Sequence, residues 1–118
     1  MSAIEAPRRR LDLRAGLREL GRALPEAMRG FTDLHRAATV DGALPRAEKE
    51  LMALAIGICQ GCGDCIVLHV HDAVRAGATS EQVHEAIAVA VMMGGGTATV
   101  YAIEALEALK QFQDTAAT

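Results

Sequence analysis

The stretch of sequence that decides the fold is Leu44–Gly96, LPRAEKELMALAIGICQGCGDCIVLHVHDAVRAGATSEQVHEAIAVAVMMGGG. Apolar residues recur through it at helical intervals, and prolines and glycines divide it into segments. A helix is expected over Pro45–Ile58, because proline suits a first helical position and Gly61 can cap the C-terminus. A second helix is expected over Cys62–Ala76, starting at Cys62 or one residue later, with Gly77 as its cap.

Two more helices are expected on either side of a glycine triplet. Thr79 and Gln82 have the spacing of a capping box, which predicts a helix over Ser80–Met93. Gly94–Gly96 should break that helix as a close-packing turn, because Lys and Ser or Thr do not follow it in the pattern that a phosphate-binding loop requires. A further helix is expected over Thr97–Phe112, where apolar residues again recur at helical spacing.

The N-terminal part of the chain has a helical pattern as well. Helices are expected over Leu11–Leu24 and over Pro25–Val40, and an Asp-Gly pair marks a turn after them. The tail Asp114–Thr118 should fray. No segment has the pattern of a strand, so the sequence predicts an all-α bundle of about six helices.

Length and composition predict one domain that associates with copies of itself. The chain has 118 residues, 51% of them hydrophobic, and its aromatic residues are two Phe and one Tyr. A single domain is expected over 1–118, with its core at 43–110 preceded by helices at 11–41. Ser80–Met93 and the start of the next helix are apolar or small on nearly every face, which predicts burial centrally or in a subunit interface.

Charge and hydropathy restrict the partners. The net charge of −3 does not favour nucleic acid, and Arg8–Arg10 is expected to be a solvated, partly disordered tail. The longest apolar run, Ala86–Met93, has eight residues, whereas a bilayer span needs about 20. With no signal-peptide pattern, we expect a cytoplasmic protein without a membrane partner. Structural disulfides are uncommon there, so closely spaced cysteines should be catalytic, redox-active or metal-binding.

The motif that carries chemistry is Cys62-Gly63-Asp64-Cys65 followed by His69. On a helix the two cysteines and the histidine fall within an arc of about 60°. A thiol in the first turn of a helix lies at the positive end of the helix dipole, which favours the nucleophilic thiolate. The pattern therefore predicts a base and two thiols on one helix face, suited to disulfide exchange or attack on a peroxide.

Glu50 is the candidate fourth member of this site. The sequence alone does not place it near the cysteines. If the helices on either side of Gly61 pack antiparallel, Glu50 lies about as far from the turn as His69 does. Its carboxylate would then orient the imidazole or relay its proton.

These residues resemble a known signature. Glu50, eleven residues, the Cys62–Cys65 motif, three residues and His69 are similar to the alkylhydroperoxidase D-like proteins of the carboxymuconolactone decarboxylase family. The resemblance covers roughly 43–110. It implies an all-α fold assembled as a homotrimer or homohexamer, and reduction of a peroxide or a disulfide without a metal or cofactor.

The resemblance also implies roles and partners. Cys65 would be the nucleophile, Cys62 the resolving thiol, and His69 with Glu50 a proton relay. A dithiol such as lipoamide, or a thioredoxin-like reductant, would reopen the disulfide, and a peroxiredoxin is a further implied partner. The chain departs from the family at Asp64, where alkylhydroperoxidase D proteins carry a second histidine. That carboxylate should oppose thiol ionisation, which favours disulfide exchange over rapid peroxide reduction.

Two other functions stay open. A cofactor-free decarboxylase or lactone-processing activity is the second, because the resemblance implies the fold of the decarboxylases as well. The decarboxylase branch of the family, however, lacks the cysteine pair. A metal-binding oligomer is the third, because Cys59, Cys62, Cys65 and His69 have ligand-like spacing. Cys59 by itself is expected in the core. The remaining histidines are given no role: His71 is expected at the surface or an interface, and the other two are expected to be structural (His35 and His84).

Overall fold

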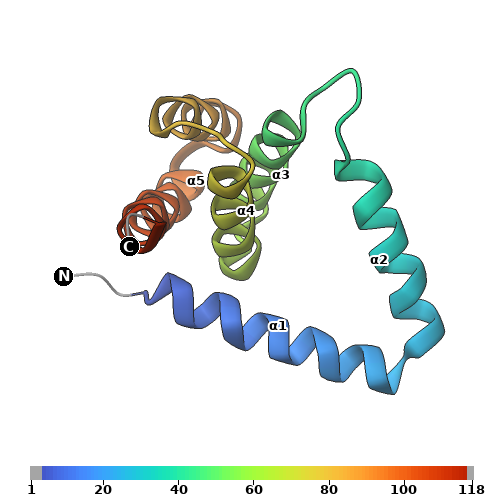
Figure 1. Ribbon diagram of the computed structural model, residues 1–118. Coiled ribbons are helices and arrows are strands. Elements are labelled where there is room, and N and C mark those ends of the chain that lie inside the picture. Colours follow the sequence, from blue (N-terminus) through green and yellow to red (C-terminus); the bar gives the residue numbers. More distant parts are fainter. Residues whose placement is uncertain (1–3, 117–118) are drawn as a thin grey trace.

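The computed structural model describes residues 4–116, and these form an all-helical fold (Figure 1). The described part of the chain contains five helices and no strand. They are α1 (Ala6–Ala23), α2 (Pro25–Thr39), α3 (Arg46–Gln60), α4 (Gly63–Arg75) and α5 (Ser80–Ala116). The expected fold class is confirmed.

Helices α3 and α4 form an antiparallel pair at the centre of the core. Glu50 meets His69, and a Cβ added to Gly57 would lie 3.3 Å from the Cβ of Cys65, so the two helices run in opposite directions. The turn between them depends on Gly61, whose φ of 67° is the left-handed conformation expected of its cap. The largest buried apolar side chains of this pair are Leu54, Ile58, Ile66, Val67 and Val70.

Helix α5 is bent at Gly95 into the two helices expected from the sequence. Gly95 has φ 69° and ψ −150°, which interrupts the helical backbone. The expected capping box is present, with Thr79 N donating to Gln82 Oε1 at 2.9 Å and Gln82 N donating to Thr79 Oγ1 at 3.1 Å. The helix continues to Ala116, so the part of the expected frayed tail that the structure describes is helical.

Helix α1 begins at Ala6, five residues before the expected start, and it includes Arg8–Arg10. The expectation of a disordered arginine tail is therefore wrong. Pro7 suits the first turn of a helix, and Ala6 is fully buried. Arg9 is fixed by ion pairs to Asp64 at 3.0 Å and Glu104 at 3.4 Å. Contacts distant in the sequence thus order this segment.

The two ends of the described chain meet. The backbone N–H of Ala6 donates to Gln111 Oε1 at 2.6 Å, and Gln111 Nε2 donates to the carbonyl of Ile4 at 2.9 Å. Beyond this anchored end, α1 and α2 form a bent arm, in which α1 runs outward and α2 turns back toward α3 (Figure 1). The bend lies at Leu24, immediately before Pro25.

Much apolar surface is exposed on the subunit. Met92 and Met93 of α5 are 72% and 74% exposed, so central burial of this helix is wrong for these residues. By length and composition alone, Ser80–Asp114 could cross a membrane, with a mean hydropathy of 1.7 and 22% of that window buried. This is weak evidence for a span, because core helices of soluble proteins meet the same criterion. Further exposed apolar residues are Phe31, Leu34, Met52, Ile56, Val89, Val100 and Ile103.

Candidate active site

The cysteine pair lies at the N-terminus of α4. Cys62 is the N-cap residue, and its sulfur accepts a hydrogen bond from the backbone N–H of Cys65 at 3.2 Å. The two residues are joined by a disulfide, with their Cα atoms 5.2 Å apart. Because α4 begins at Gly63, Cys65 is in its first turn. A thiolate formed there on reduction is stabilised by the unpaired N–H groups and the helix dipole.

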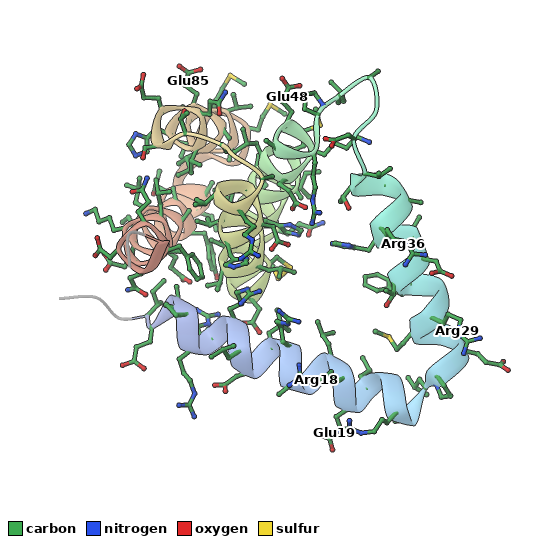
Figure 2. All side chains as sticks on the ribbon, viewed as in Figure 1. Arg18, Glu19, Arg29, Arg36, Glu48 and Glu85 are labelled. Carbon is green, nitrogen blue, oxygen red and sulfur yellow. A yellow bond between two sulfur atoms is a disulfide. The ribbon has the colours of Figure 1, made fainter. Side chains whose placement is uncertain are left out.

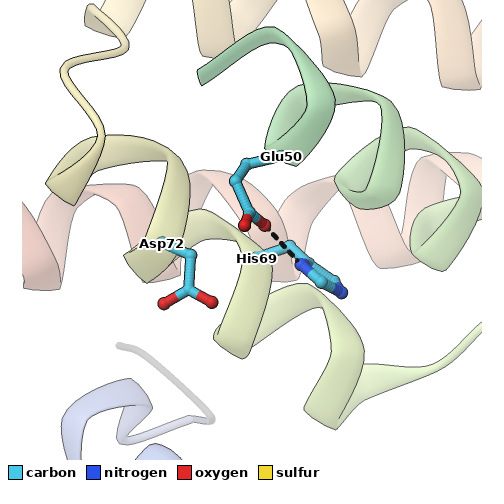
Figure 3. A group of neighbouring side chains, drawn as sticks. All are labelled: Glu50, His69 and Asp72. Carbon is cyan, nitrogen blue, oxygen red and sulfur yellow. Dashed lines mark hydrogen bonds and ion pairs between the residues drawn. The ribbon is translucent and has the colours of Figure 1, made fainter. Parts of the chain in front are cut away.

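Glu50 of α3 and His69 of α4 are in contact (Figure 3). The distance between His69 Nδ1 and Glu50 Oε1 is 2.8 Å. The Glu50 side chain is fully buried, whereas that of His69 is 15% exposed. This is the contact that antiparallel packing of the two helices would allow. An ionised carboxylate can only accept, so Nδ1 carries the proton and Nε2 is left as the basic nitrogen.

The electrostatic surroundings keep Glu50 ionised. Burial raises the pKa of the Glu50 carboxyl. The hydrogen bond from His69 and the charges of His69, Arg46 and His35 together lower this pKa by more than burial raises it. The net result is a pKa below the usual value. Arg46 Nε lies 3.6 Å from Glu50 Oε2, which has no hydrogen-bond partner. Glu50 is therefore a buried anion that holds His69 in one tautomer.

A second histidine, from α2, lies against His69. The rings of His35 and His69 are stacked, with centroids 6.4 Å apart and an angle of 18° between planes. His35 Nε2 is buried and has no hydrogen-bond partner. Sequence patterns assign His35 no role, because no motif surrounds it. The contact depends on how the α1–α2 arm folds back, which no local pattern encodes.

The carboxylate inside the motif has a counter-charge. Asp64 Oδ1 accepts hydrogen bonds from Arg9 Nε at 3.2 Å and Arg9 Nη2 at 3.0 Å. Arg9 also pairs with Glu104 of α5. The Asp64 side chain is half-exposed, so its residual field is further reduced by solvent. The guanidinium thus offsets the effect expected of Asp64 on the neighbouring thiols.

The cysteine-rich metal site expected as an alternative is not assembled. The Cys62 and Cys65 sulfurs are bonded to each other, and the Cys59 thiol donates to the carbonyl of Ala90 at 3.4 Å. Cys59 is exposed, so its expected place in the core is wrong.

A different donor set lies beside the relay. Among the described residues, Glu50, His69 and Asp72 each have a potential ligand atom within 4.8 Å of the other two (Figure 3). The cationic Arg46 beside Glu50 opposes a metal ion there.

The other two histidines stand apart from the relay. His71 Nδ1 contacts Asp72 Oδ1 at 2.9 Å, and its ring meets the edge of Phe112 with centroids 5.2 Å apart. His71 is therefore half-buried between α4 and α5. His84 is exposed on α5. The site thus combines a disulfide at the start of α4 with a histidine one turn further on that pairs with a buried glutamate of α3.

Residues 25–108 match the sequence profile of the carboxymuconolactone decarboxylase family. The chain belongs to this family. A carboxymuconolactone decarboxylase family protein from Legionella pneumophila has a crystal structure with a TM-score of 0.87 and 40% identity, covering 91% of this chain and 96% of that one. A family member from Thermotoga maritima has a TM-score of 0.71 and 28% identity, covering 84% and 91%.

Two sequence relatives extend the comparison within the carboxymuconolactone decarboxylase family. An uncharacterized protein of Cupriavidus necator is 47% identical over 87 residues, which cover 74% of this chain and 77% of that protein. The alkyl hydroperoxide reductase AhpD of Mycobacterium tuberculosis is 33% identical over 63 residues, which cover 53% of this chain and 36% of that protein. The resemblance to AhpD-like proteins is thereby confirmed.

Proposed function

We propose that the protein is a thiol-dependent oxidoreductase that reduces a peroxide or a disulfide through Cys62 and Cys65. The observation that carries this proposal is the disulfide at the start of α4, followed one turn later by His69, which pairs with the buried Glu50. The similarity to AhpD supports it. A part in the antioxidative response has also been suggested for the Thermotoga maritima relative.

With a hydroperoxide ROOH, the reduced Cys65 is the attacking group. His69 Nε2 accepts the Cys65 proton, and the thiolate attacks the terminal peroxide oxygen. An S–O bond forms and the O–O bond breaks, which leaves a sulfenic acid on Cys65. The alkoxide takes the proton back from His69 and leaves as ROH, while Glu50 stabilises the transient imidazolium.

The second half of the turnover forms the disulfide. The Cys62 thiol attacks the Cys65 sulfur, the S–S bond forms, and hydroxide leaves with the Cys62 proton as water. The two cysteines lose two electrons and the peroxide gains them. A dithiol, of the lipoamide or thioredoxin type, then reduces the disulfide by exchange. The two thiols are sufficient for this chemistry, so we expect no metal or organic cofactor.

The decarboxylase alternative is less well supported, because that reaction does not need a cysteine pair. The Arg9–Asp64 ion pair favours the thiol mechanism, since Arg9 offsets the negative charge next to the nucleophile Cys65. Peroxide reduction is therefore compatible with aspartate at the position where AhpD proteins carry histidine. A peroxiredoxin stays a proposed partner whose oxidised form the reduced protein would recycle.

The proposal is tested by titrating thiols on the reduced chain before and after one equivalent of an organic hydroperoxide. Three thiols should fall to one, with the new disulfide mapped by mass to Cys62–Cys65. Cys65→Ser should abolish turnover, and His69→Ala should lower it by about 100-fold or more. Cys59→Ser is the matched control and should keep both the thiol loss and the turnover. Three thiols surviving the oxidant, or normal turnover in Cys65→Ser, would exclude the mechanism.

A further inference from the structure

A cavity of 650 Å³ lies between α1, α2 and α4. Its walls include three arginines, Arg10 and Arg14 from α1 and Arg29 from α2. The rest of the lining is largely apolar, with Leu17 and Phe31 among the residues that face it. A cavity of this size and make-up suits a small molecule with an apolar body and a charged end.

The lining of this cavity carries more positive than negative charge, because its three arginines face only two carboxylates. Of the two carboxylates that line it, Asp33 is paired with Arg36 at 2.7 Å and Asp72 with His71 at 2.9 Å. Arg10 Nε is buried without a hydrogen-bond partner. Burial and then the charge of Arg14 lower the pKa of the Arg10 guanidinium, against an opposing effect of Asp72. An anion would satisfy these groups, since a buried unpaired donor costs free energy.

The cavity reaches the face of α4 that carries the nucleophile. Leu68 and Asp72 line it, and they follow Cys65 by three and seven residues. That spacing places all three within an arc of about 60° on the helix, over a length of about 10 Å. His35 also lines the cavity and stacks on His69. A bound molecule could therefore contact Arg10 beside Asp72 and extend along α4 towards Cys65.

We propose that this cavity binds an amphipathic carboxylic acid, with its carboxylate on Arg10 and Arg14 and its apolar chain against Leu17 and Phe31. Together with the proposed thiol chemistry, on which this step rests, such binding makes the hydroperoxide of a medium- or long-chain fatty acid the substrate class. The peroxide group of such a molecule lies far enough from its carboxylate to span the length of α4 involved. An apolar helix of a second copy would not serve as the occupant, because it would leave Arg10 unpaired.

The binding half is tested without any redox chemistry, by calorimetric titration of the oxidised full-length protein with decanoic acid and with decanol. Decanoic acid should bind at least tenfold more tightly than decanol. Arg14→Gln should remove this difference, and because Arg14 is exposed on α1 the fold should survive. Arg18→Gln, an exposed arginine of the same helix outside the cavity, should preserve it. Equal affinities for acid and alcohol, or equal effects of the two variants, would overturn the proposal.

The substrate half is tested by steady-state kinetics with a fatty-acid hydroperoxide and its methyl ester. The acid should have the lower KM, and Arg14→Gln should raise the KM for the acid at least tenfold while Arg18→Gln does not. Acid and ester turned over with the same KM would overturn the substrate assignment. Decanoic acid that binds as expected, with no peroxide reduced at all, would support the cavity as an anion site and contradict the proposed function instead.

Discussion

Glu50 is the residue whose surroundings do most to define the site. It is fully buried, and its carboxylate contacts His69 and lies 3.6 Å from Arg46. Its pKa is lowered in the folded protein, so the ionised form is favoured by folding. Below its usual pKa the unfolded chain binds a proton that the folded chain resists. The stability that the Glu50 carboxylate contributes is therefore fully present above its usual pKa. This contribution is lost as the pH falls through the pKa of the folded state.

We expect Glu50→Gln to reduce this acid sensitivity. The ordinary pKa of the group is 4.5, so the wild type should lose stability progressively below that pH, and the glutamine variant should show a flatter profile there. The Tm measured from pH 3 to pH 7 checks this. Glu48→Gln, at an exposed position of the same helix, is the control and should follow the wild type. Parallel profiles for wild type and Glu50→Gln would contradict the role given to the buried charge.

Single residues also show how far the sequence predicts the site. Glu50 and His69 could be paired because a short turn at Gly61 leaves few ways for two apolar helices to pack. The expected effect of Asp64 on the thiols did not take its counter-charge into account, because Arg9 is 55 residues away in the chain. His35 could not be foreseen, since nothing near it in the sequence indicates that α2 folds back over α4.

At the scale of elements, the bend in α5 depends on close packing as well as on Gly95. A Cβ added to Gly94 would lie 2.6 Å from the Cβ of Ala98 and 3.3 Å from Cys59 Sγ. The first distance is too short for two carbon atoms, so the backbone would have to shift. Gly94 therefore lets the chain after the bend pass close to the residue before the bend, and lets that residue approach Cys59 of α3.

We expect Gly94→Ala to destabilise the protein by about 1–3 kcal/mol, as overpacking does elsewhere. Gly16→Ala is the matched control. Gly16 is a helical residue of α1 with nothing within 4 Å of an added Cβ, so alanine there should stabilise by about 0.5–1 kcal/mol. Urea unfolding of the two variants measures both changes. A Gly94→Ala variant as stable as the wild type would show that the contact at the bend is not tight.

Helix ends were predictable where their signals are local. Gly61 and the Thr79–Gln82 box set their helix boundaries with atoms only a few residues apart, so the sequence placed them well. The start of α1 was missed because the order of Arg8–Arg10 depends on Asp64 and Glu104, which lie on other helices. Helix boundaries that depend on tertiary contacts cannot be predicted from local sequence patterns.

At the scale of the whole molecule, the exposed apolar residues of α5 are too many for an isolated subunit. Met92 and Met93 are largely exposed, as are Val100 and Ile103 further along the helix. Chains with few large aromatic anchors can cover such surfaces by association. We therefore propose that this face of α5 is buried between copies of the chain, in a homotrimer or homohexamer.

Analytical ultracentrifugation checks this proposal. The wild type should sediment as a single closed oligomer, and Met93→Lys should dissociate it, because a charge in an apolar interface is costly to desolvate. Glu19→Lys, at an exposed position of α1, introduces the same side chain away from this face and should leave the oligomer intact. A monomeric wild type, or an intact Met93→Lys oligomer, would rule out this face as the interface.

The hydrogen bonds between Gln111 and the segment at Ile4 and Ala6 make the described chain nearly a closed loop. Any polypeptide continuing from either end would leave the fold from neighbouring points (Figure 1). Two attached modules would then be held side by side at a high effective concentration, on the side of the molecule away from the bend between α1 and α2 (Figure 2). For the same reason the two ends of the described chain could be joined by a short linker and the chain reopened elsewhere, since neighbouring ends are what circular permutation requires.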